Sequence, residues 1–590
     1  TVLGNTTAGV GLNAGVDLDD WRDWGAECNI DFKIWWYGEA DVWIDKIILD
    51  DGPGDLLFSG EYDDEIKEEA FRFGNNVNNY AFYTDELPYS NYLAARYVDS
   101  LLKEGHPNGK FHFTLSTYHH TRGHKNNDLG HQPAFENVQP LSVQIDAHEF
   151  FNTRIPYQFN NVNSEIPDDW KSINNSYYNN EIQITSLGDR TSVVDDGVKT
   201  YHDNPKPNPW GSLIYQVNQA REQRDAYAPG TKLIIQPQIH AFSTYNTAQN
   251  KFKGNLREPT NEEIQVQAMV SIAHGVDGIC WFMHPSMSWG SGDMPEFGFR
   301  GLSHFEGMEF DQQSSAEVLV SIGLTNIFGL SLDPQGKRTS NVYGQNKFQY
   351  VADMNQKIEN WKETLDNTNW VSGWSVHAPG EGANHEYITD IKSIYRNPSS
   401  PYDFIPTNED ATKYWEMAFF EPITSQGREK LFMMVNRRVV PETLNVGSGD
   451  IRQLKIKFDT GDLLGCNNWK LIDLNTEESI VFDKNNPGSG GYLEMGNQPG
   501  DLGYFEPGEG KLFKLVPAIQ EGGTFVTNEE IGDEFNCYGE VNTDGYDLEL
   551  KLGTTLNFSQ TGKIIVEDGK FFSGKYQAGQ SNVRLEGRCK

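Results

Sequence analysis

Two adjacent carboxylates, Asp85 and Glu86, end a predicted β-strand in the segment Tyr-Thr-Asp-Glu-Leu-Pro at residues 83–88. Cleavage of a glycosidic bond needs a proton donor at the leaving oxygen and a second carboxylate that activates water or attacks carbon. Carboxyl groups in apolar and aromatic surroundings hold their proton near neutral pH, which would suit Glu86 to the donor role. Alternatively, one of the two residues caps the following helix, because acidic side chains favour the first helical turn.

Asp146 is a further candidate for catalysis, because it lies on the polar face of the predicted strand 141–148. His148 is close to it in the sequence, and Glu149 follows directly after the strand. In a catalytic site Asp146 would act as a base, a nucleophile or an anchor for the ligand. A structural role in holding a loop is equally open, since buried carboxylates are normally paired.

Other polar and aromatic residues on the predicted strands are candidates for substrate binding. They would donate and accept hydrogen bonds with sugar hydroxyls or offer a ring for stacking. Any one of them alone could instead be an interior polar group whose hydrogen bonds are satisfied within the protein. The candidate substrate-binding residues are Tyr118, His148, Glu149, Gln236, Gln238, His240, Trp281 and His284.

A metal site is weighed because histidines gather after the second predicted strand, at His119, His120, His124 and His131. Their spacing matches no strong zinc signature, and a polar loop at the rim of a cleft is the alternative. The sequence also shows no Gly-rich phosphate loop between a strand and a helix, and no Gly-x-Ser-x-Gly elbow. We therefore predict no cofactor and no bound metal, and we disfavour nucleotide chemistry and serine hydrolysis.

The elements that position these residues are predicted strands at 79–86, 111–118, 141–148, 233–240 and 278–284. Side chains alternate between the two faces of a strand. Three of these strands, at 111–118, 141–148 and 233–240, are apolar on one face and polar on the other. An apolar face suits packing under helices, and polar residues at the carboxyl ends of parallel strands suit an active site.

Helices are predicted between these strands, at 90–104, 211–226 and 261–275. The last of them has the clearest boundaries, since Thr260 and Glu263 form a Thr-x-x-Glu capping box and Gly275 stands at its end. Strands that alternate with helices indicate a parallel sheet covered by helices.

Four regions are predicted along the 590 residues, which are too many for one hydrophobic core. Residues 1–65 contain alternating strands similar to the end of a carbohydrate-binding jelly roll, and 66–400 contain the α/β-barrel. Residues 410–517 return to alternating strands with Gly and Asn turns, which predicts an antiparallel β-sandwich. Residues 520–590 predict a small β-module or stacked β-coils, with a role in attachment or sorting.

The amino-acid composition disfavours some classes of binding partner and favours a location outside the cell. With 48 Lys and Arg against 84 Asp and Glu, the formal net charge is −36, which disfavours binding to nucleic acid or an anionic membrane. No apolar run is long enough to span a bilayer. Abundant Asn, only five cysteines and a first residue other than Met favour a processed protein that is secreted or on the cell surface. Of those cysteines, Cys537 and Cys589 could pair.

The order of motifs resembles the (β/α)8-barrel glycoside hydrolases that bacteria secrete, which often carry a C-terminal β-sandwich. The resemblance covers residues 75–290 and rests on Tyr-x-Asp-Glu-x-Pro, Gln-x-Gln-x-His and Pro-Thr-x-x-Glu, followed by Ala-x-Gly-x-x-Gly-Ile-x-Trp-Phe. It implies that Glu86 is the acid/base residue at the end of the fourth barrel strand. The first barrel strands would then be missing, cryptic, or contributed by another polypeptide or precursor fragment.

Two departures from that pattern bear on mechanism. Asp85 stands where the large retaining clan usually has Asn, and an Asp-Glu pair is similar to hexosaminidases that use substrate assistance. Residues 279–284 contain no match to the clan's nucleophilic Glu. The leading hypothesis is a glycoside hydrolase acting on a polysaccharide or oligosaccharide. The alternatives are a non-catalytic glycan-binding or cell-surface structural protein with a barrel-like fold, and a lyase or metal-dependent hydrolase that uses the His-rich loop.

Overall fold

The computed structural model describes residues 57–76, 81–84, 92–116, 132–147, 213–246, 251–256, 259–282, 287–289, 297–302, 304–305, 337–338, 345–376, 383–395, 415–423, 428–437, 451–551, 553–566 and 571–573. The strands predicted near the N-terminus lie outside these residues. The described part has a mixed α/β region followed by β-structure, and none of its helices is long and apolar enough to cross a membrane.

Contacts divide the chain into two compact units. The first comprises Thr1–Asp146 and Gln219–Ile234, and the second comprises Ala147–Asn218 and Ile235–Lys590. The boundary passes through one helix and, at two places, through a strand of the α/β region.

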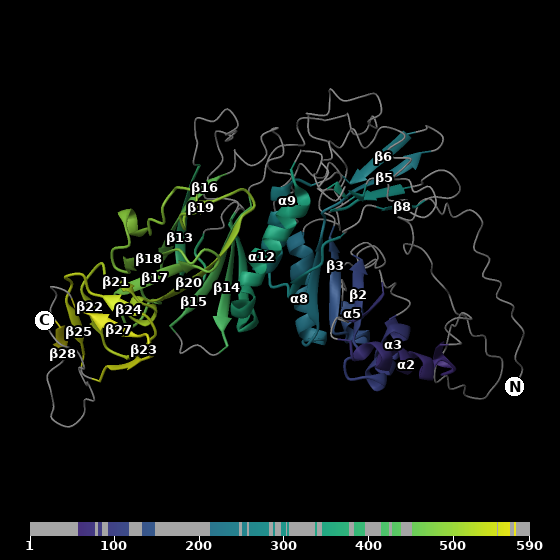
Figure 1. The fold of residues 1–590 in the computed structure, drawn as a ribbon, viewed down its shortest axis with the longest axis horizontal. Coiled ribbons are helices and arrows are strands. Elements are labelled where there is room, and N and C mark those ends of the chain that lie inside the picture. Colours follow the sequence, from purple (N-terminus) through teal and green to yellow (C-terminus); the bar gives the residue numbers. More distant parts are fainter. Residues whose placement is uncertain are drawn as a thin grey trace, which may run out of the picture. The chain divides into compact units, whose positions relative to one another are not determined.

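The first unit alternates helices with short parallel strands, as the sequence predicts (Figure 1). Its strands are β1 (Phe82–Thr84), β2 (Phe111–Ser116), β3 (Ser142–Ala147) and the first half of β4 (Lys232–Pro237). Its helices are α2 (Asp63–Gly74), α3 (Tyr92–Gly105), α5 (Gln132–Asn137) and the second half of α8 (Leu213–Tyr227). β2 lies between β1 and β3 and runs parallel to both.

The apolar face of these strands packs under helices. Phe113, Leu115, Val143 and Ile145 are fully buried. Tyr92 of α3 contacts Phe113, with ring centroids 6.5 Å apart. The alternation in the sequence therefore separates an apolar face from a polar one, and both faces are buried in the structure.

In the second unit, β4 continues beside β7 (Gly278–Ile279), where the Cys280 backbone N–H donates to the Ile235 carbonyl at 2.8 Å. The strand order is β1-β2-β3-β4-β7. These five strands lie where the sequence predicts them. Closure of the sheet into a (β/α)8 barrel stays a prediction.

A four-stranded antiparallel sheet, which the sequence analysis does not predict, follows β4 and β7. Its order is β6-β5-β9-β8. The strands are β5 (Ala241–Asn246), β6 (Lys251–Leu256), β8 (Met287–Trp289) and β9 (Phe297–Arg300), and a separate pair is formed by β10 (His304–Phe305) and β11 (Lys337–Arg338).

Two helices connect this region with the sandwich. α9 (Asn261–Ala273) begins with the predicted capping box at Thr260 and Glu263, and nearly all of its residues are buried. It contacts α12 (Lys347–Asp366) and several strands of the sandwich. Because α9 is buried on all sides, its sequence does not divide into an apolar face and a polar face as that of a surface helix does.

The β-sandwich pairs a six-stranded sheet, β12-β14-β15-β20-β17-β18, with a three-stranded sheet, β13-β16-β19. Its interior is aromatic, and Trp415 meets Phe505 edge-to-face at 5.0 Å between ring centroids. The strands are β12 (Thr368–Val376), β13 (Ile388–Tyr395), β14 (Trp415–Pro422), β15 (Lys430–Asn436), β16 (Arg452–Phe458), β17 (Asn468–Asp473), β18 (Ser479–Asp483), β19 (Tyr504–Phe505) and β20 (Gly510–Pro517), and the 3-10 helix η5 (Ser489–Gly491) follows β18.

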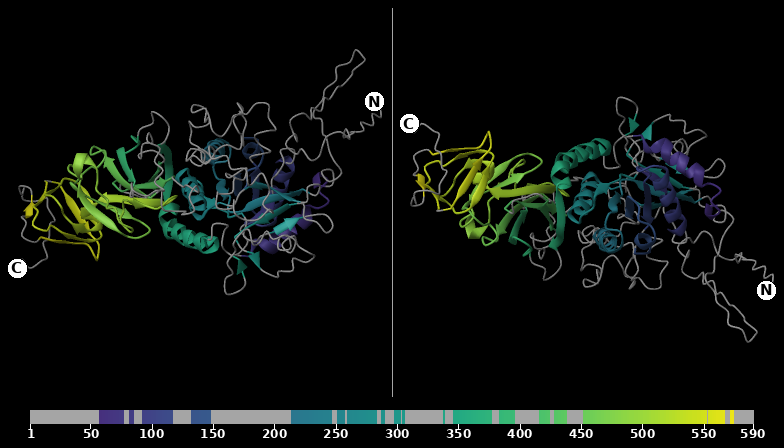
Figure 2. Two further views of the ribbon diagram at one scale, coloured as in Figure 1. Left: turned by 90° about the horizontal axis from the view of Figure 1, so that it is seen from above. Right: turned by 90° about the horizontal axis from the view of Figure 1, so that it is seen from below.

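The C-terminal segment forms stacked parallel β-coils, one of the two alternatives that the sequence leaves open (Figure 2). Successive coils stack in register, so that Glu529 pairs with Leu548 and Leu548 pairs with Phe571. The short helix α13 (Ala518–Glu521) leads into β21 (Gly523–Thr524), β22 (Glu529–Ile531), β23 (Glu534–Cys537), β24 (Glu540–Asn542), β25 (Leu548–Leu550), β26 (Thr555–Phe558), β27 (Lys563–Ile565) and β28 (Phe571–Ser573).

One hydrophobic cluster extends from the sandwich into the β-coils. It contains Trp469 and Leu471 of the sandwich together with Phe535 and Val541 of the coils. Cys537 is a buried free thiol in this cluster, and Cys589 lies outside the described residues.

Candidate functional site

A row of hydrogen-bonded polar side chains crosses the three parallel strands of the first unit. The Tyr83 hydroxyl of β1 lies 2.7 Å from the Thr114 hydroxyl of β2. The Gln144 amide of β3 donates to the same Thr114 oxygen at 3.4 Å. Thr114 and Gln144 are buried, whereas Tyr83 is 54% exposed, so the row runs from the interior of the sheet to the surface. These three residues constitute the polar row.

His112 lies on the same face, one alternation before Thr114. Its Nδ1 is 2.9 Å from the Ser142 hydroxyl, and its ring centroid is 5.4 Å from that of Tyr83. Burial lowers the pKa of His112 and favours the neutral imidazole, although hydrogen bonds with Ser142 and Gln144 oppose this. A neutral ring can both donate and accept, which lets it join the polar face without adding a buried charge.

The register of the strands relates the polar row to the candidate carboxylates. Thr84 pairs with Phe113, and Phe113 pairs with Val143. Asp146 is three residues beyond Val143 in β3, where its backbone pairs with Ser116. Glu86 is two residues beyond Thr84 in the sequence. Asp146 therefore lies near the carboxyl end of β3 on the same face as Gln144, whereas Asp85 and Glu86 lie outside the described residues.

In the second unit, Gln238 forms its hydrogen bonds with other groups of the protein interior. Its backbone N–H donates to Gln267 Oε1 at 2.9 Å, and its side-chain amide donates to the His240 carbonyl at 3.0 Å. Gln267 Nε2 in turn donates to the Gln238 carbonyl at 3.0 Å. Gln238 is fully buried, so these bonds support the interior-polar alternative for this residue rather than substrate contact.

A parallel bridge between Gln238 and Phe282 links the segment after β4 to the segment after β7, which contain His240 and Trp281 respectively. His240 Nδ1 lies 3.0 Å from the Phe282 carbonyl, and the His240 side chain is fully buried. Trp281 Nε1 donates to Asn355 Oδ1 of α12 at 2.8 Å. The indole of Trp281 is therefore oriented by α12, while part of it stays accessible.

Of the other predicted site residues, some lie within the described part of the chain and others lie outside it. Gln236 is buried at the end of β4, and the backbone of Asp146 is placed in β3. No group of three His, Cys, Asp or Glu that could hold a metal occurs among the described residues. Outside them lie Asp85, Glu86, Tyr118, His148, Glu149 and His284, together with His119, His120, His124 and His131.

Two contributors to this region were not identified from the sequence. Gln267 is fully buried on α9, and Lys347 is buried with its Nζ donating to the Ile239 carbonyl at 2.9 Å. Together they fix the backbone after β4. Nothing in the sequence distinguishes Gln267, because α9 carries other polar residues such as Gln265 and Ser271. Nothing in the sequence indicates that Lys347 is buried, because a lysine near a helix start is ordinarily exposed.

A second polar network attaches α9 to the sandwich without any feature of a binding site. Glu416 of β14 lies 2.9 Å from His274 Nε2 and 3.0 Å from Arg437 Nη1, and all three side chains are buried. The other ring nitrogen of His274 is 3.1 Å from Asn218 Oδ1. The charges compensate one another in the interior, which is the condition for burying them.

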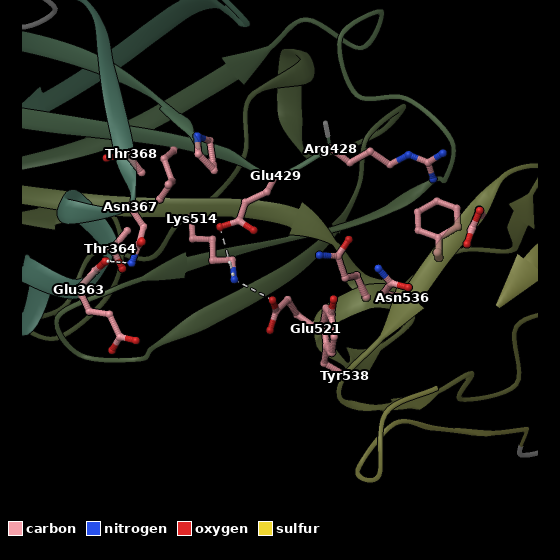
Figure 3. Close-up of a pocket in the computed structure, with 15 residues that line it drawn as sticks. Glu363, Thr364, Asn367, Thr368, Arg428, Glu429, Lys514, Glu521, Asn536 and Tyr538 are labelled. Atoms are coloured by element: carbon pink, nitrogen blue, oxygen red, sulfur yellow. Dashed lines mark hydrogen bonds and ion pairs between the residues drawn. The ribbon is translucent and has the colours of Figure 1, made fainter. Parts of the chain in front are cut away.

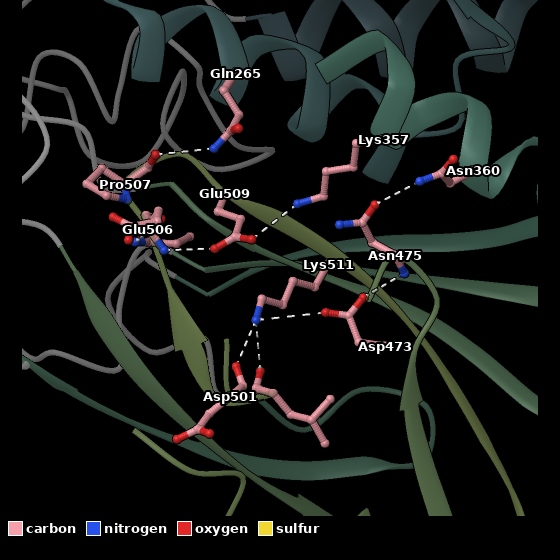
Figure 4. Close-up of polar contacts among 12 residues, drawn as sticks. Gln265, Lys357, Asn360, Asp473, Asn475, Asp501, Glu506, Pro507, Glu509 and Lys511 are labelled. Atoms are coloured by element: carbon pink, nitrogen blue, oxygen red, sulfur yellow. Dashed lines mark hydrogen bonds and ion pairs between the residues drawn. The ribbon is translucent and has the colours of Figure 1, made fainter. Parts of the chain in front are cut away.

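Further polar contacts join the helices to the loops of the sandwich (Figure 4). Lys357 of α12 pairs with Glu509 at 3.2 Å, and Gln265 of α9 donates to the Pro507 carbonyl at 3.4 Å. Lys511 Nζ donates to the Asp501 carbonyl at 2.9 Å, and burial lowers its pKa. The contacts of Lys357 and Gln265 fasten the helices to the sandwich, whereas that of Lys511 lies within the sandwich.

Comparisons with known proteins yield matches among solved structures alone. No protein-family model matches the chain, and no curated protein does. A β-galactosidase from the psychrophilic Marinomonas ef1 aligns at 10% identity and a TM-score of 0.23, covering 47% of this chain and 28% of its own.

Two arabinofuranosidases align over more of this chain. One has 12% identity and a TM-score of 0.25, and an α-L-arabinofuranosidase from Thermotoga maritima has 10% identity and a TM-score of 0.23. Each alignment covers 72% of this chain and 62% of the other. All three similar structures are glycoside hydrolases, and this chain spans less than two thirds of their length.

Proposed function

We propose that this protein is a glycoside hydrolase whose active site lies at the carboxyl ends of β1, β2 and β3. The observation that carries the proposal is the polar row, in which Tyr83, Thr114 and Gln144 place hydrogen-bonding groups of three adjacent parallel strands on one face. Sites of parallel α/β folds are built where such strands end.

In the proposed mechanism Glu86 protonates the leaving oxygen, and Asp85 or Asp146 is its partner. A partner that activates water or attacks carbon is needed in either stereochemical course. If the substrate carries an acetamido group, Asp85 would orient it and the sugar itself would supply the nucleophile. Asp146 is two residues beyond Gln144 on β3 and so lies on the same face as the polar row, which supports its part in the site.

The finer parts of the proposal concern substrate and setting. We propose a polysaccharide or oligosaccharide substrate and a location outside the cell or on its surface, consistent with the acidic, cysteine-poor composition. A (β/α)8 barrel, completed within this chain or by another polypeptide, would hold the site. Trp281, which α12 orients through Asn355, is proposed as a stacking surface for a sugar ring.

A non-catalytic glycan-binding protein is the second candidate. A barrel-like fold does not require catalysis, and the internal hydrogen bonds of Gln238 are compatible with either candidate. The two candidates differ in turnover, because a binding protein would retain glycans without cleaving them.

The deciding experiment compares wild type with Glu86→Gln on a panel of polysaccharides and chromogenic glycosides. We expect turnover to fall by about 10² or more with folding intact, as for loss of a general acid. Glu68→Gln, which changes an exposed carboxylate of α2, is the matched control and should retain full turnover. Asp85→Asn and Asp146→Asn then identify the partner. Equal turnover of wild type and Glu86→Gln would remove Glu86 from the mechanism.

A further inference from the structure

A pocket of about 710 Å³ lies in the second unit, between the end of α12, the sandwich and the first β-coil (Figure 3). Its size falls within the ~300–1,000 Å³ range of small-molecule sites. Thr364 and Thr368 line it from the helix side, Lys514 from the sandwich, and Asn536 and Tyr538 from the coil. None of these residues belongs to the proposed catalytic site.

The cations of this pocket are already compensated. Lys514 Nζ lies 2.7 Å from Glu521 and 3.6 Å from Glu429. Arg428 pairs with Asp533 at 3.1 Å and lies over the ring of Phe535, 4.0 Å from its centroid. A phosphate, sulfate or uronate would therefore have to compete with carboxylates that already hold both cations.

Further carboxylates make an anionic ligand still less favourable. Glu363 and Glu534 also line the pocket, and the Asn557 amide donates to Glu534 at 2.7 Å. The lining is thus rich in acceptors and in paired charges. An uncharged ligand with many hydroxyls, each able to donate and accept, suits such a lining.

Tyr538 supplies an accessible aromatic ring. Its side chain is 48% exposed, although its backbone is fixed. The Tyr538 N–H donates to the Gln520 carbonyl at 2.8 Å, and the Tyr538 carbonyl accepts from Thr561 Oγ1 at 2.6 Å. With the backbone fixed, the tyrosine ring has only two side-chain torsions to order when it stacks on the C–H face of a sugar, so the entropy loss is small.

We propose that this pocket binds a neutral oligosaccharide, with Tyr538 as the stacking platform and the threonines and amides around it as partners of the hydroxyls. The inference goes beyond hydrolysis, since it assigns a binding site and no catalytic step. It would add a second point of attachment to a polymer, which raises the effective concentration of glycan at the protein.

The test is calorimetric titration of the full chain with neutral hexasaccharides of glucose, xylose, mannose and galactose. We expect at least one of them to bind wild type, and Tyr538→Ala to weaken that binding by about tenfold or more, equivalent to about 1.4 kcal/mol. Tyr546→Ala, which removes another exposed tyrosine of the same β-coils, should bind as wild type does. Thr364→Trp, which fills the pocket from the opposite wall, should also abolish binding.

Several results would overturn the proposal. These are the absence of binding by all four hexasaccharides, binding that survives both Tyr538→Ala and Thr364→Trp, or tighter binding of a galacturonate hexamer than of any neutral one. Hydrolysis of a short chromogenic glycoside separates the two sites. A Tyr538→Ala protein that loses binding but cleaves normally supports the pocket, while Glu86→Gln tests the catalytic site alone.

Discussion

At the scale of single residues, Glu529 shows how a buried charge can be held at an internal contact. Its carboxylate accepts from the backbone N–H groups of Asn467, Asn468 and Glu530 and from the Asn468 amide, at 2.6 to 3.0 Å. Glu529 belongs to the β-coils and both asparagines to the sandwich, so this residue fastens the two together. Burial raises the pKa of Glu529 to about 7, although these donors oppose the rise.

This raised pKa predicts a pH-dependent stability. Between about pH 4.5 and 7 the folded protein holds the Glu529 proton more tightly than the unfolded chain does. The free energy of unfolding should therefore fall as pH rises through this window, by up to about 3 kcal/mol. Glu529→Gln resembles the protonated form, so its free energy of unfolding should not show this fall with pH.

Urea unfolding of both proteins at pH 5 and pH 8 measures the effect. The two should be similar at pH 5, and the Gln variant should be the more stable at pH 8. A difference between them that is the same at both pH values would contradict the assignment.

At the scale of elements, α9 is defined by its two ends. The Glu263 N–H donates to the Thr260 hydroxyl at 3.2 Å, and the Thr260 N–H donates to the Glu263 carboxylate at 2.8 Å. Beyond the helix, Gly275 has φ +81°, and a Cβ there would come within 2.9 Å of the Trp370 ring. Both ends are encoded locally, whereas the burial of every face of α9 comes from its neighbours.

We expect Thr260→Ala to lower the free energy of unfolding by about 1 kcal/mol, because it removes the acceptor for a buried N–H at the helix start. Thr260→Ser keeps that acceptor and should retain most of the stability. Urea unfolding monitored by far-UV circular dichroism measures both. If the Ala and Ser variants were equally stable, the capping bond would contribute nothing.

At the scale of the whole molecule, the sandwich and the β-coils of the second unit share one hydrophobic cluster. Helix α13 contacts β17 of the sandwich as well as β23 and β24 of the coils. A shared core of this kind makes two segments unfold as one cooperative unit. The pocket proposed above lies where the sandwich and the β-coils meet, so it exists only while both are folded.

Shortening the chain to end at Gly522 should therefore destabilise the sandwich, because Trp469, Leu471 and their neighbours lose apolar contacts. We expect the melting temperature, followed by tryptophan fluorescence, to fall by at least about 5 °C. A chain that ends at Ser573 keeps all the described coils and is the matched control. Two separate transitions in the full chain, with the sandwich unaffected by the truncation, would show that the coils fold independently.

Local pattern was sufficient for much of the α/β region and for the β-strands that follow it. Alternation marked the apolar faces of β2, β3 and β4, and the Thr-x-x-Glu box marked the start of α9. The same reasoning missed α12, although Asn346 caps it and Val351, Met354 and Trp361 give it an apolar side. It also missed the four-stranded antiparallel sheet, whose strands are short.

The sequence by itself determined which residues alternate, where helices begin, and that carboxylates follow the ends of β1 and β3. These are local properties, set by side-chain periodicity and by hydrogen bonds between neighbours in the chain. Only the tertiary structure decided that Gln238 is used internally by Gln267, and that Thr364, Lys514 and Tyr538 line one pocket. Such contacts join residues far apart in the chain, and their partners depend on how whole sheets and helices pack.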